Sequence, residues 1–421
     1  MELTLSAFGR AVGVETGIGE LMDDLGSALA DRSQVRAMLG GGQPAEIPEM
    51  TQLFHTLLTT VLASPADVQR VLGQYDPAEG EAGFRAAFAQ LMGAKYGWQL
   101  TAANIGVSAG GQSACFHLLN ALAGAGQQVL IPLLPDYMGY RDQLVSGAEF
   151  LGLSGIPERT AGGQRFKYRL DRQAVVAAPE SVRLMVLSRP TNPSGNVLSD
   201  AEIRFLSDEC ARRGIPLLID HAYGAPFPNA LYTPTQPYWA PHHIHLHSLS
   251  KLGLPGTRTS IMIAHPDIVQ LQQKMTAVTS LANPGLGQAL VLPLIQDGSL
   301  PALCAEVVTP YYRQKRDVAV AALEELLAGV EYVLHEPEGA FFLWLWLPGV
   351  DTQVLAQRLK EQGVLVISGH WFFFGQDAQE DVPAHQRECL RLTYSMPEDE
   401  VRIGIQVLAE ELQRGEVGEP T

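Results

Sequence analysis

The sequence contains few cysteines, and none of them stand close together. The four cysteines are Cys115, Cys210, Cys304 and Cys389, and no two of them form a C-x-x-C pair. Small disulfide-stabilised domains need a dense set of cysteines, so this pattern argues against a disulfide framework. We therefore expect reduced, mostly buried thiols in a cytoplasmic protein.

Basic residues are also scarce. The chain has 29 lysines and arginines against 45 aspartates and glutamates, a formal net charge of −16 at pH 7. Nucleic acids and anionic membranes attract positively charged surfaces. This balance therefore argues against nucleic acid and membrane partners, and it carries no information about catalysis.

Long hydrophobic runs and a leader-like start are absent from the sequence. The first six residues have no basic region, and every long apolar window is interrupted by glycine, proline or a charge. We therefore expect neither a signal peptide nor a membrane span. A length of 421 residues exceeds one ordinary core, which predicts a large domain with a smaller companion.

The stretch from Ser248 to Arg258 carries the clearest sign of chemistry. Lys251 stands between two serines and a glycine-rich turn, and Arg258 follows seven positions later. A lysine that condenses with a carbonyl must be rigidly held and partly desolvated, so that some of it is unprotonated. Hydroxyls and an arginine suit a phosphate dianion. This pattern points to a lysine that carries pyridoxal phosphate, although for this stretch alone a solvated surface turn is the better interpretation.

Short apolar strands alternate with helices from residue 105 onward. The expected strands are 105–108, 129–132, 184–188, 215–219 and 244–247, and the expected helices are 114–123 and 199–213. This order predicts an α/β fold, a mostly parallel sheet with helices on both faces. Ligands of such sheets bind beyond the carboxyl ends of the strands. Each expected strand is followed there by a polar cluster, which predicts one shared site.

The two ends of the chain differ from this α/β part. Residues 1–45 are expected to form a helix-bearing arm that ends in Gly40, Gly41 and Gly42, which fit a hinge or backbone close to a ligand. Beyond residue 295, expected helices at 310–327, 352–362 and 397–414 join expected strands at 339–347, 364–367 and 389–394. We therefore expect an arm (1–45), a large cofactor-binding domain (46–295) and a small α+β domain (296–421).

Taken in order, the polar clusters resemble one known family. They are Tyr75-x-x-x-x-Gly80, Gly110-Gly111-Gln112, Pro135-x-Tyr137, Asn192-Pro193-Ser194-Gly195, Asp220-x-x-Tyr223, Ser248-x-Ser250-Lys251 through Arg258, and Arg391. This set resembles the fold-type I aminotransferases of the class I and II superfamily. The resemblance implies a seven-stranded, mostly parallel sheet, pyridoxal 5′-phosphate as cofactor, and a homodimer.

The resemblance also implies a role for each residue around the cofactor. Lys251 would anchor the cofactor and move the proton, Asp220 would hold the proton on the ring nitrogen, and Tyr223 with Asn192 would bond the phenolic oxygen. The phosphate and ring contacts would come from Gly110, Gly111, Gln112, Tyr137, Ser248, Ser250, Arg258 and, from the other subunit, Tyr75. Read without the resemblance, Asp220 also fits a strand-end cap and Tyr137 an ordinary core aromatic.

Substrate contacts are implied at four positions. Arg391 would hold the α-carboxylate in a bidentate fork with Asn192 assisting, although a surface salt bridge is the alternative for this arginine. The backbone at Gly42 would pass close to the substrate. The side-chain pocket would be apolar, with Ile18 on the arm as a candidate lining residue.

Three longer stretches, residues 39–50, 219–228 and 337–346, resemble the valine–pyruvate aminotransferases within this superfamily. This resemblance implies exchange of an amino group between valine and pyruvate. An alanine or broad aromatic specificity and a carbon–sulfur β-lyase stay open as alternatives. A transcription regulator with this fold would need a basic DNA-binding domain, and the short N-terminal arm offers none.

Two other patterns are assigned to the core. His243, His245 and His247 alternate on one expected strand face, but no acidic or cysteine ligand accompanies them, so we expect no functional metal site. Trp344 and Trp346 follow two phenylalanines in an apolar strand. Packing within the small domain explains this aromatic group more simply than ligand stacking does.

Overall fold

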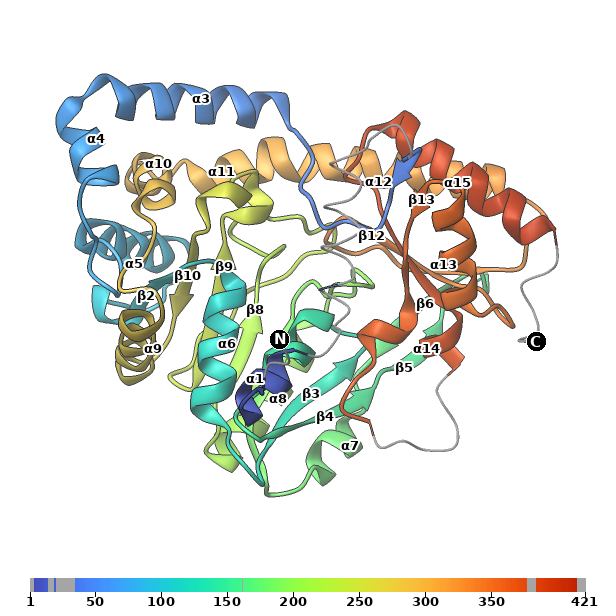
Figure 1. The fold of residues 1–421 in the computed structure, drawn as a ribbon, viewed down its shortest axis with the longest axis horizontal. Coiled ribbons are helices and arrows are strands. Elements are labelled where there is room, and N and C mark those ends of the chain that lie inside the picture. The colour runs from blue at the N-terminus through green and yellow to red at the C-terminus, as the bar shows by residue number, and fades with distance from the viewer. Residues whose placement is uncertain (1–3, 14–18, 20–34, 161, 377–383, 415–421) are drawn as a thin grey trace.

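Two β-sheets organise the chain (Figure 1). The protein is described by a computed structural model that covers residues 4–13, 19, 35–160, 162–376 and 384–414. The first sheet has seven strands in the order β2-β10-β9-β8-β7-β3-β4. Strand β10 is antiparallel to both of its neighbours, and the other neighbouring pairs are parallel. The predicted α/β fold with a mostly parallel seven-stranded sheet is confirmed.

The strands of the first sheet are β2 (Ile105–Ser108), β3 (Gln128–Leu134), β4 (Glu149–Ser154), β7 (Val182–Ser188), β8 (Leu217–Asp220), β9 (His243–Ser248) and β10 (Ser260–Ile263). Its helices are α5 (Ala82–Tyr96), α6 (Gly111–Leu122), α7 (Arg172–Ala177), α8 (Asp200–Arg213), α9 (Pro266–Thr279) and α10 (Gly285–Gln296). Helix α8 begins at the capping box that the sequence predicts, since the Ser199 side chain and the Glu202 side chain each accept from the other's backbone N–H.

The second sheet has six strands in the order β14-β15-β12-β11-β6-β5. They are β5 (Ile156–Arg159), β6 (Arg165–Arg169), β11 (Val333–His335), β12 (Phe342–Trp346), β14 (Ile367–Ser368) and β15 (Cys389–Thr393). Because β6 pairs with β11, residues 156–169 extend a sheet whose other strands come after residue 332. The domain boundaries expected at residues 45 and 295 stay a prediction.

The single strand expected at residues 364–367 is wrong. The structure divides it into β13 (Val364–Leu365), which pairs with β1 (Ala37–Met38) of the arm, and β14, which pairs with β15. The chain therefore exchanges one pairing partner for another around Val366. Sequence alternation does not reveal such a change, because both halves are apolar.

The remaining helices are α1 (Ala7–Val12), α3 (Pro48–Ala63), α4 (Pro65–Leu72), α11 (Leu300–Leu303), α12 (Thr309–Leu326), α13 (Thr352–Glu361), α14 (Ala384–Glu388) and α15 (Glu398–Gln413). In Figure 1 the long helix α12 runs from the first sheet towards the second, where α13 and α15 lie.

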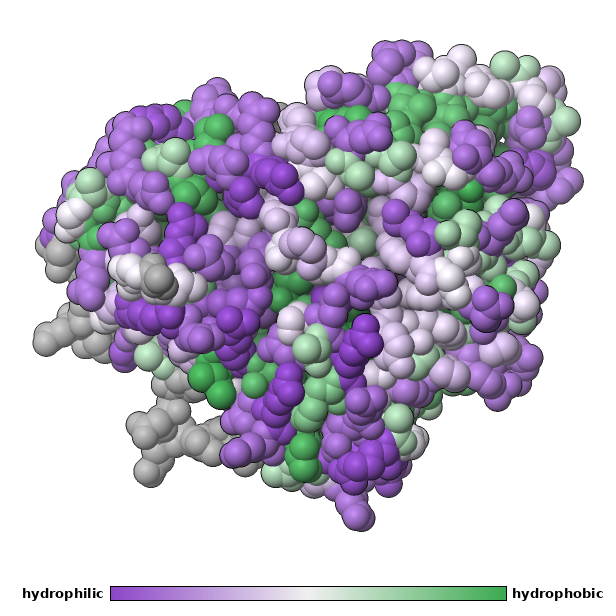
Figure 2. All heavy atoms as spheres, turned by 180° about the vertical axis from the view of Figure 1, so that it is seen from behind, coloured by the Kyte–Doolittle hydropathy of each residue, from purple (hydrophilic) through white to green (hydrophobic). Residues whose placement is uncertain are grey.

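Among the described residues no single helix is long and apolar enough to cross a membrane. One bent pair, Gly285–Gln296 with Leu300–Leu326, reaches that length only across a 94° bend. On the face seen in Figure 2, hydrophobic residues lie in scattered patches among hydrophilic ones.

The four cysteines are buried and unpaired. The three histidines of β9 also lie in the interior, together with His221 from the end of β8. The His221 ring stacks on His247 at 4.9 Å and on His245 at 5.1 Å. Neither ring nitrogen of His247 has a hydrogen-bond partner among the described residues. Within the described part of the chain, no group of His, Cys, Asp and Glu side chains is arranged to hold a metal ion.

The burial of these histidines predicts that the folded protein loses stability in acid. Burial lowers the pKa of His243 to about 4 and that of His247 to about 3, and it lowers the pKa of His221 and of His245 well below 6.5. Below pH 6.5 these histidines bind protons in the unfolded chain but stay neutral in the folded chain. Stability is therefore full above pH 6.5 and falls towards pH 4, by about 2 kcal/mol at pH 5 for each histidine that stays neutral.

Urea unfolding at pH 7.0 and pH 5.0 checks this expectation. The midpoint should fall strongly at pH 5.0, and His247→Phe should reduce the difference between the two midpoints, because the new ring fits among Phe88, Phe227 and His221. Exposed His265→Phe is the matched control and should leave the difference unchanged. Equal midpoints at both pH values would contradict the argument.

Candidate active site

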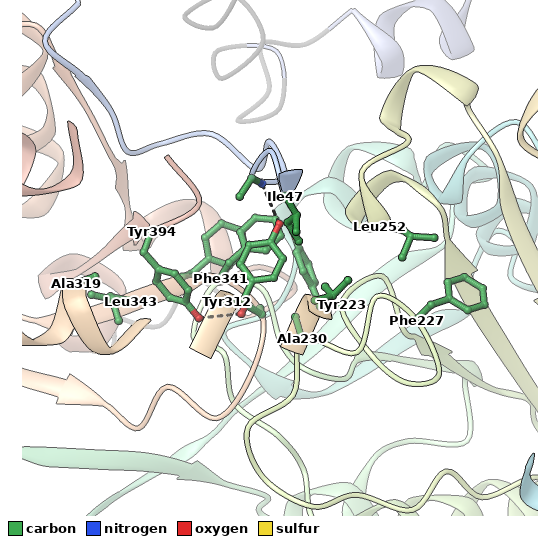
Figure 3. Packing of buried hydrophobic residues seen from close by; sticks show 14 of the residues in the cluster. Ile47, Tyr223, Phe227, Ala230, Leu252, Tyr312, Ala319, Phe341, Leu343 and Tyr394 are labelled. Atoms are coloured by element: carbon green, nitrogen blue, oxygen red, sulfur yellow. Dashed lines mark hydrogen bonds between the residues drawn. The ribbon is translucent and has the colours of Figure 1, made fainter. Parts of the chain in front are cut away.

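Lys251 lies just beyond the carboxyl end of β9, in a single helical turn. Its Nζ donates a hydrogen bond to the Gly42 carbonyl at 2.5 Å and lies 5.7 Å from the centre of the Tyr223 ring and 6.0 Å from that of Phe341. Figure 3 shows the rings of Tyr223, Phe341 and Tyr312 side by side. Burial and the nearby cation of Arg391 lower the pKa of Lys251 to about 8. Much of this amine is therefore uncharged in mildly alkaline solution.

Asp220 is the last residue of β8, the strand beside β9. Its carboxylate accepts the Ala222 backbone N–H at 2.8 Å and the Tyr140 hydroxyl at 3.0 Å. Burial raises the pKa of Asp220, while these two bonds and the Lys251 charge act against the rise. Such a carboxylate can hold a proton on a ring nitrogen that comes near it.

Tyr140 and Asp136 were not among the residues expected from the sequence. Asp136 follows β3 and accepts the Tyr137 backbone N–H at 2.6 Å and the Ser188 backbone N–H at 3.0 Å. Burial raises the pKa of Asp136 to about 7. Asp136 thus ties the loop that carries Tyr137 and Tyr140 to the end of β7. The Tyr-x-x-Tyr spacing after a buried strand was the available signal.

The start of helix α6 forms a second part of the site. Gly110 precedes the helix with φ 88°, and a Cβ there would lie 2.2 Å from the Arg258 guanidinium. The first N–H groups of α6, including those of Gly111 and Gln112, therefore lie beside a cation. The Tyr137 hydroxyl donates to the Gln112 side chain at 3.3 Å. A helix start, a guanidinium and neighbouring hydroxyls fit a phosphate dianion.

Arg391 lies on β15 of the second sheet and is 1% exposed. Its Nη1 donates to the Asn192 side chain at 2.6 Å and its Nη2 donates to the Gly40 carbonyl. Among the described residues, its Nε has no hydrogen-bond partner and no carboxylate forms an ion pair with it. Burial lowers the pKa of this arginine to about 10. A buried cation without an anion is costly, so this group is suited to bind an anionic ligand.

The structure places the other expected residues as follows. A Cβ on Gly42 would lie 3.5 Å from the Lys251 Nζ and 3.9 Å from the Tyr223 hydroxyl, so these three residues meet. The Ser248 hydroxyl accepts the Ser250 N–H at 3.1 Å, in the turn that leads to Lys251. Tyr75 is 82% exposed. Ile18 lies outside the described residues.

Removing the Tyr140 hydroxyl tests whether its hydrogen bond stabilises the charged form of Asp220. In Tyr140→Phe the carboxylate loses one of its two hydrogen bonds, and a bond to a charged group contributes about 1.5–3 kcal/mol. The pKa of Asp220 should rise further, so the acid limb of the kcat/KM profile should move up by about one to two pH units. Tyr238→Phe, on the exposed side of the histidine group, is the control. An unmoved acid limb would contradict the role of Tyr140.

Comparisons with known proteins agree with this arrangement. The sequence profile of the family "Aminotransferase class I and II" matches residues 48–408. The valine–pyruvate aminotransferase of Escherichia coli K12 is 39% identical over 98% of this chain and 99% of its own length. The crystal structure of valine–pyruvate aminotransferase from Salmonella typhimurium LT2 has a TM-score of 0.85 at 38% identity, covering 94% of this chain and 99% of that one.

A more distant structure shows the fold alone. An aspartate aminotransferase mutant of Thermus thermophilus has a TM-score of 0.78 at 21% identity, covering 97% of this chain and all of that one. The family match covers far more than half of the chain, and it includes every cluster from Tyr75 to Arg391. The chain therefore belongs to the class I and II aminotransferases, a family of pyridoxal-phosphate-dependent transaminases.

Proposed function

We propose that this protein exchanges an amino group between L-valine and pyruvate, giving 3-methyl-2-oxobutanoate and L-alanine. The observation that carries the proposal is the pairing of two groups: a buried Arg391 without an anionic partner among the described residues, and a Lys251 amine whose pKa the nearby Arg391 charge helps to lower. Together they suit a substrate with one carboxylate beside a reacting amine. The near-full-length similarity to valine–pyruvate aminotransferases supports the choice of valine and pyruvate.

Pyridoxal phosphate, when bound, supplies an electron sink for the α-carbon of the substrate. The residues present fit this group. The start of α6 (Gly110, Gly111, Gln112) with Ser248, Ser250 and Arg258 would hold the phosphate. Tyr137 would lie against the ring, and Asp220 would hold the proton on its nitrogen. Asn192 and Tyr223 would bond its phenolic oxygen.

The chain itself would position the substrate and move its protons. Arg391 and Asn192 would orient the carboxylate, with the Gly42 backbone close by. The Lys251 amine would then take the proton from the α-carbon and return one at the neighbouring position. Aromatic rings form one side of the space around Lys251, since Tyr223 and Tyr312 both pack on Phe341. Ile18 stays a candidate for the side-chain pocket.

A homodimer in the cytoplasm completes the proposal. Tyr75 is exposed, as a residue that reaches the site of a second subunit would be before association. Exposed Leu72 lies in the same segment, and Val278 and Leu281 add apolar surface on the α9 side. Four buried, unpaired cysteines are compatible with a reducing compartment. We also keep the division into an arm, a large domain and a small domain as part of the proposal.

An absorbance spectrum of the purified protein tests the function. We expect a yellow band that fades when L-valine is added and returns when pyruvate is added. A yellow protein that ignores valine but responds to alanine or an aromatic amino acid would replace the substrate and keep the reaction. Release of ammonia and pyruvate from a cysteine conjugate would instead favour a β-lyase. A protein that stays colourless with added pyridoxal phosphate would contradict the proposal.

A further inference from the structure

The guanidinium of Arg391 lies over two aromatic rings. Its central carbon is 4.3 Å from the centre of the Phe342 ring and 5.2 Å from the centre of the Phe372 ring. Both phenylalanines are fully buried. A cation held against the negative faces of aromatic rings is attracted to them, most strongly where water is excluded. The rings therefore supply attraction to a buried cation that has no acidic partner in the described part of the chain.

The hydrogen bonds of Arg391 leave part of its edge free. A guanidinium carries five N–H donors in one plane. Asn192 and Gly40 take two of them, and the Nε donor has no partner among the residues that the structure describes. A carboxylate pairs best with two parallel N–H groups in that same plane. The orientation of the plane therefore decides where the carboxylate of a substrate comes to lie.

Phe372 is itself held firmly. It ends the short helical segment Gly369–Phe372, and its ring contacts Trp344 edge-on at 5.7 Å. Its carbonyl accepts the Asp136 backbone N–H at 3.1 Å. Asp136 in turn holds Tyr137, so the ring on Arg391 is connected to the loop expected to lie against the cofactor.

We infer that Phe342 and Phe372 are positioning residues, whose rings set the plane in which Arg391 binds the carboxylate of an amino or oxo acid. This inference rests on the proposed function. It adds Phe372, which no motif in the sequence singled out, and gives Phe342 a role beyond the core packing to which the sequence analysis assigned it. The rings do not touch the reacting atoms in this account; they act through the arginine.

The test uses 3-methylbutanoate, which has the carbon skeleton and carboxylate of valine but no amine. Calorimetry on the holoenzyme should show about tenfold weaker binding in Phe372→Leu than in the parent. KM for valine and for pyruvate should rise by a similar factor, with kcat little changed. The slow reaction of 2-methylpropylamine, which lacks a carboxylate, should keep its parental rate. Phe374→Leu is the matched control, since that buried ring packs on Phe150 at 5.2 Å, and it should bind as the parent does.

A fluorinated phenylalanine at position 372 keeps the ring shape while weakening its negative face, so it covers the case in which Phe372→Leu does not fold. Weaker binding of 3-methylbutanoate by that variant supports the inference, and unchanged binding overturns it. The proposed function fails differently: the parent protein itself would then neither exchange the amino group of valine nor bind 3-methylbutanoate.

Discussion

Replacing Lys251 by alanine is expected to lower turnover by about 10⁴-fold or more. The change removes the amine that the proposal uses twice, as the anchor of the cofactor and as the group that moves the proton. Burial and the cations of Arg391 and Arg258 keep the pKa of this amine low, and no other lysine of the described residues shares that setting. The yellow band of the parent should also be lost or moved in Lys251→Ala.

Exposed Lys274→Ala on helix α9 is the control for this change and should retain both turnover and spectrum. Added methylamine should restore part of the activity of Lys251→Ala, because a small amine can enter the space that the side chain leaves. In the apoprotein, uptake of pyridoxal phosphate should rise about tenfold per pH unit up to about pH 8 and then level off, as the amine loses its proton. Full turnover by Lys251→Ala would remove the basis of the proposed function.

Replacing Arg391 by leucine is expected to lower kcat/KM for valine by about 10²- to 10⁴-fold. The substrate carboxylate would lose a buried, charge-assisted partner, and breaking a buried ion pair costs about 3–5 kcal/mol. Arg391→Lys should recover only part of this loss, because an ammonium lacks the planar fork and stacks poorly on the rings of Phe342 and Phe372. Steady-state kinetics with valine and pyruvate measure the effect.

Arg402→Leu serves as the control for Arg391→Leu. Arg402 pairs with Glu325 on the surface, where ion pairs contribute little, so its kinetics should match the parent's. The spectrum of Arg391→Leu should stay yellow, because Arg391 is proposed to hold substrate and not cofactor. Parental kcat/KM in Arg391→Leu would show that another group binds the carboxylate.

Local sequence patterns were sufficient for most of the first sheet. The strands that end at Ser188 and Asp220 are short apolar runs flanked by glycine or polar residues, and burial on both faces leaves such runs little alternative to a parallel strand. The capping box at Ser199 marked the start of α8 correctly. Strands β5 and β6 were not predicted, because Arg165–Arg169 alternates charged and aromatic residues and its partner β11 lies more than 160 positions later.

The residues of the candidate site also divide into those that local motifs predict and those that only contacts in the folded chain identify. Gly110, Asp220 and Lys251 stand at or just beyond the carboxyl ends of strands, so an ordered chain of motifs was enough to expect them at one edge of the sheet. Asp136, Tyr140 and Phe372 belong to no motif. Their importance comes from contacts with Ser188, Asp220 and Arg391, which are 52, 80 and 19 residues away in the chain.

The order of strands, glycine turns and reactive side chains thus determined the family and the chemistry, because each of these features depends on residues near one another in the chain. Only the folded structure decides which groups lie close enough to influence each other's charge, to stack on one another or to form a hydrogen bond. Arg391 illustrates this. In the sequence it is one arginine on an apolar strand, and its surface salt bridge was an open alternative. Folding buries it over two rings with no acidic partner among the described residues, because its neighbours come from the arm, the first sheet and the second sheet together.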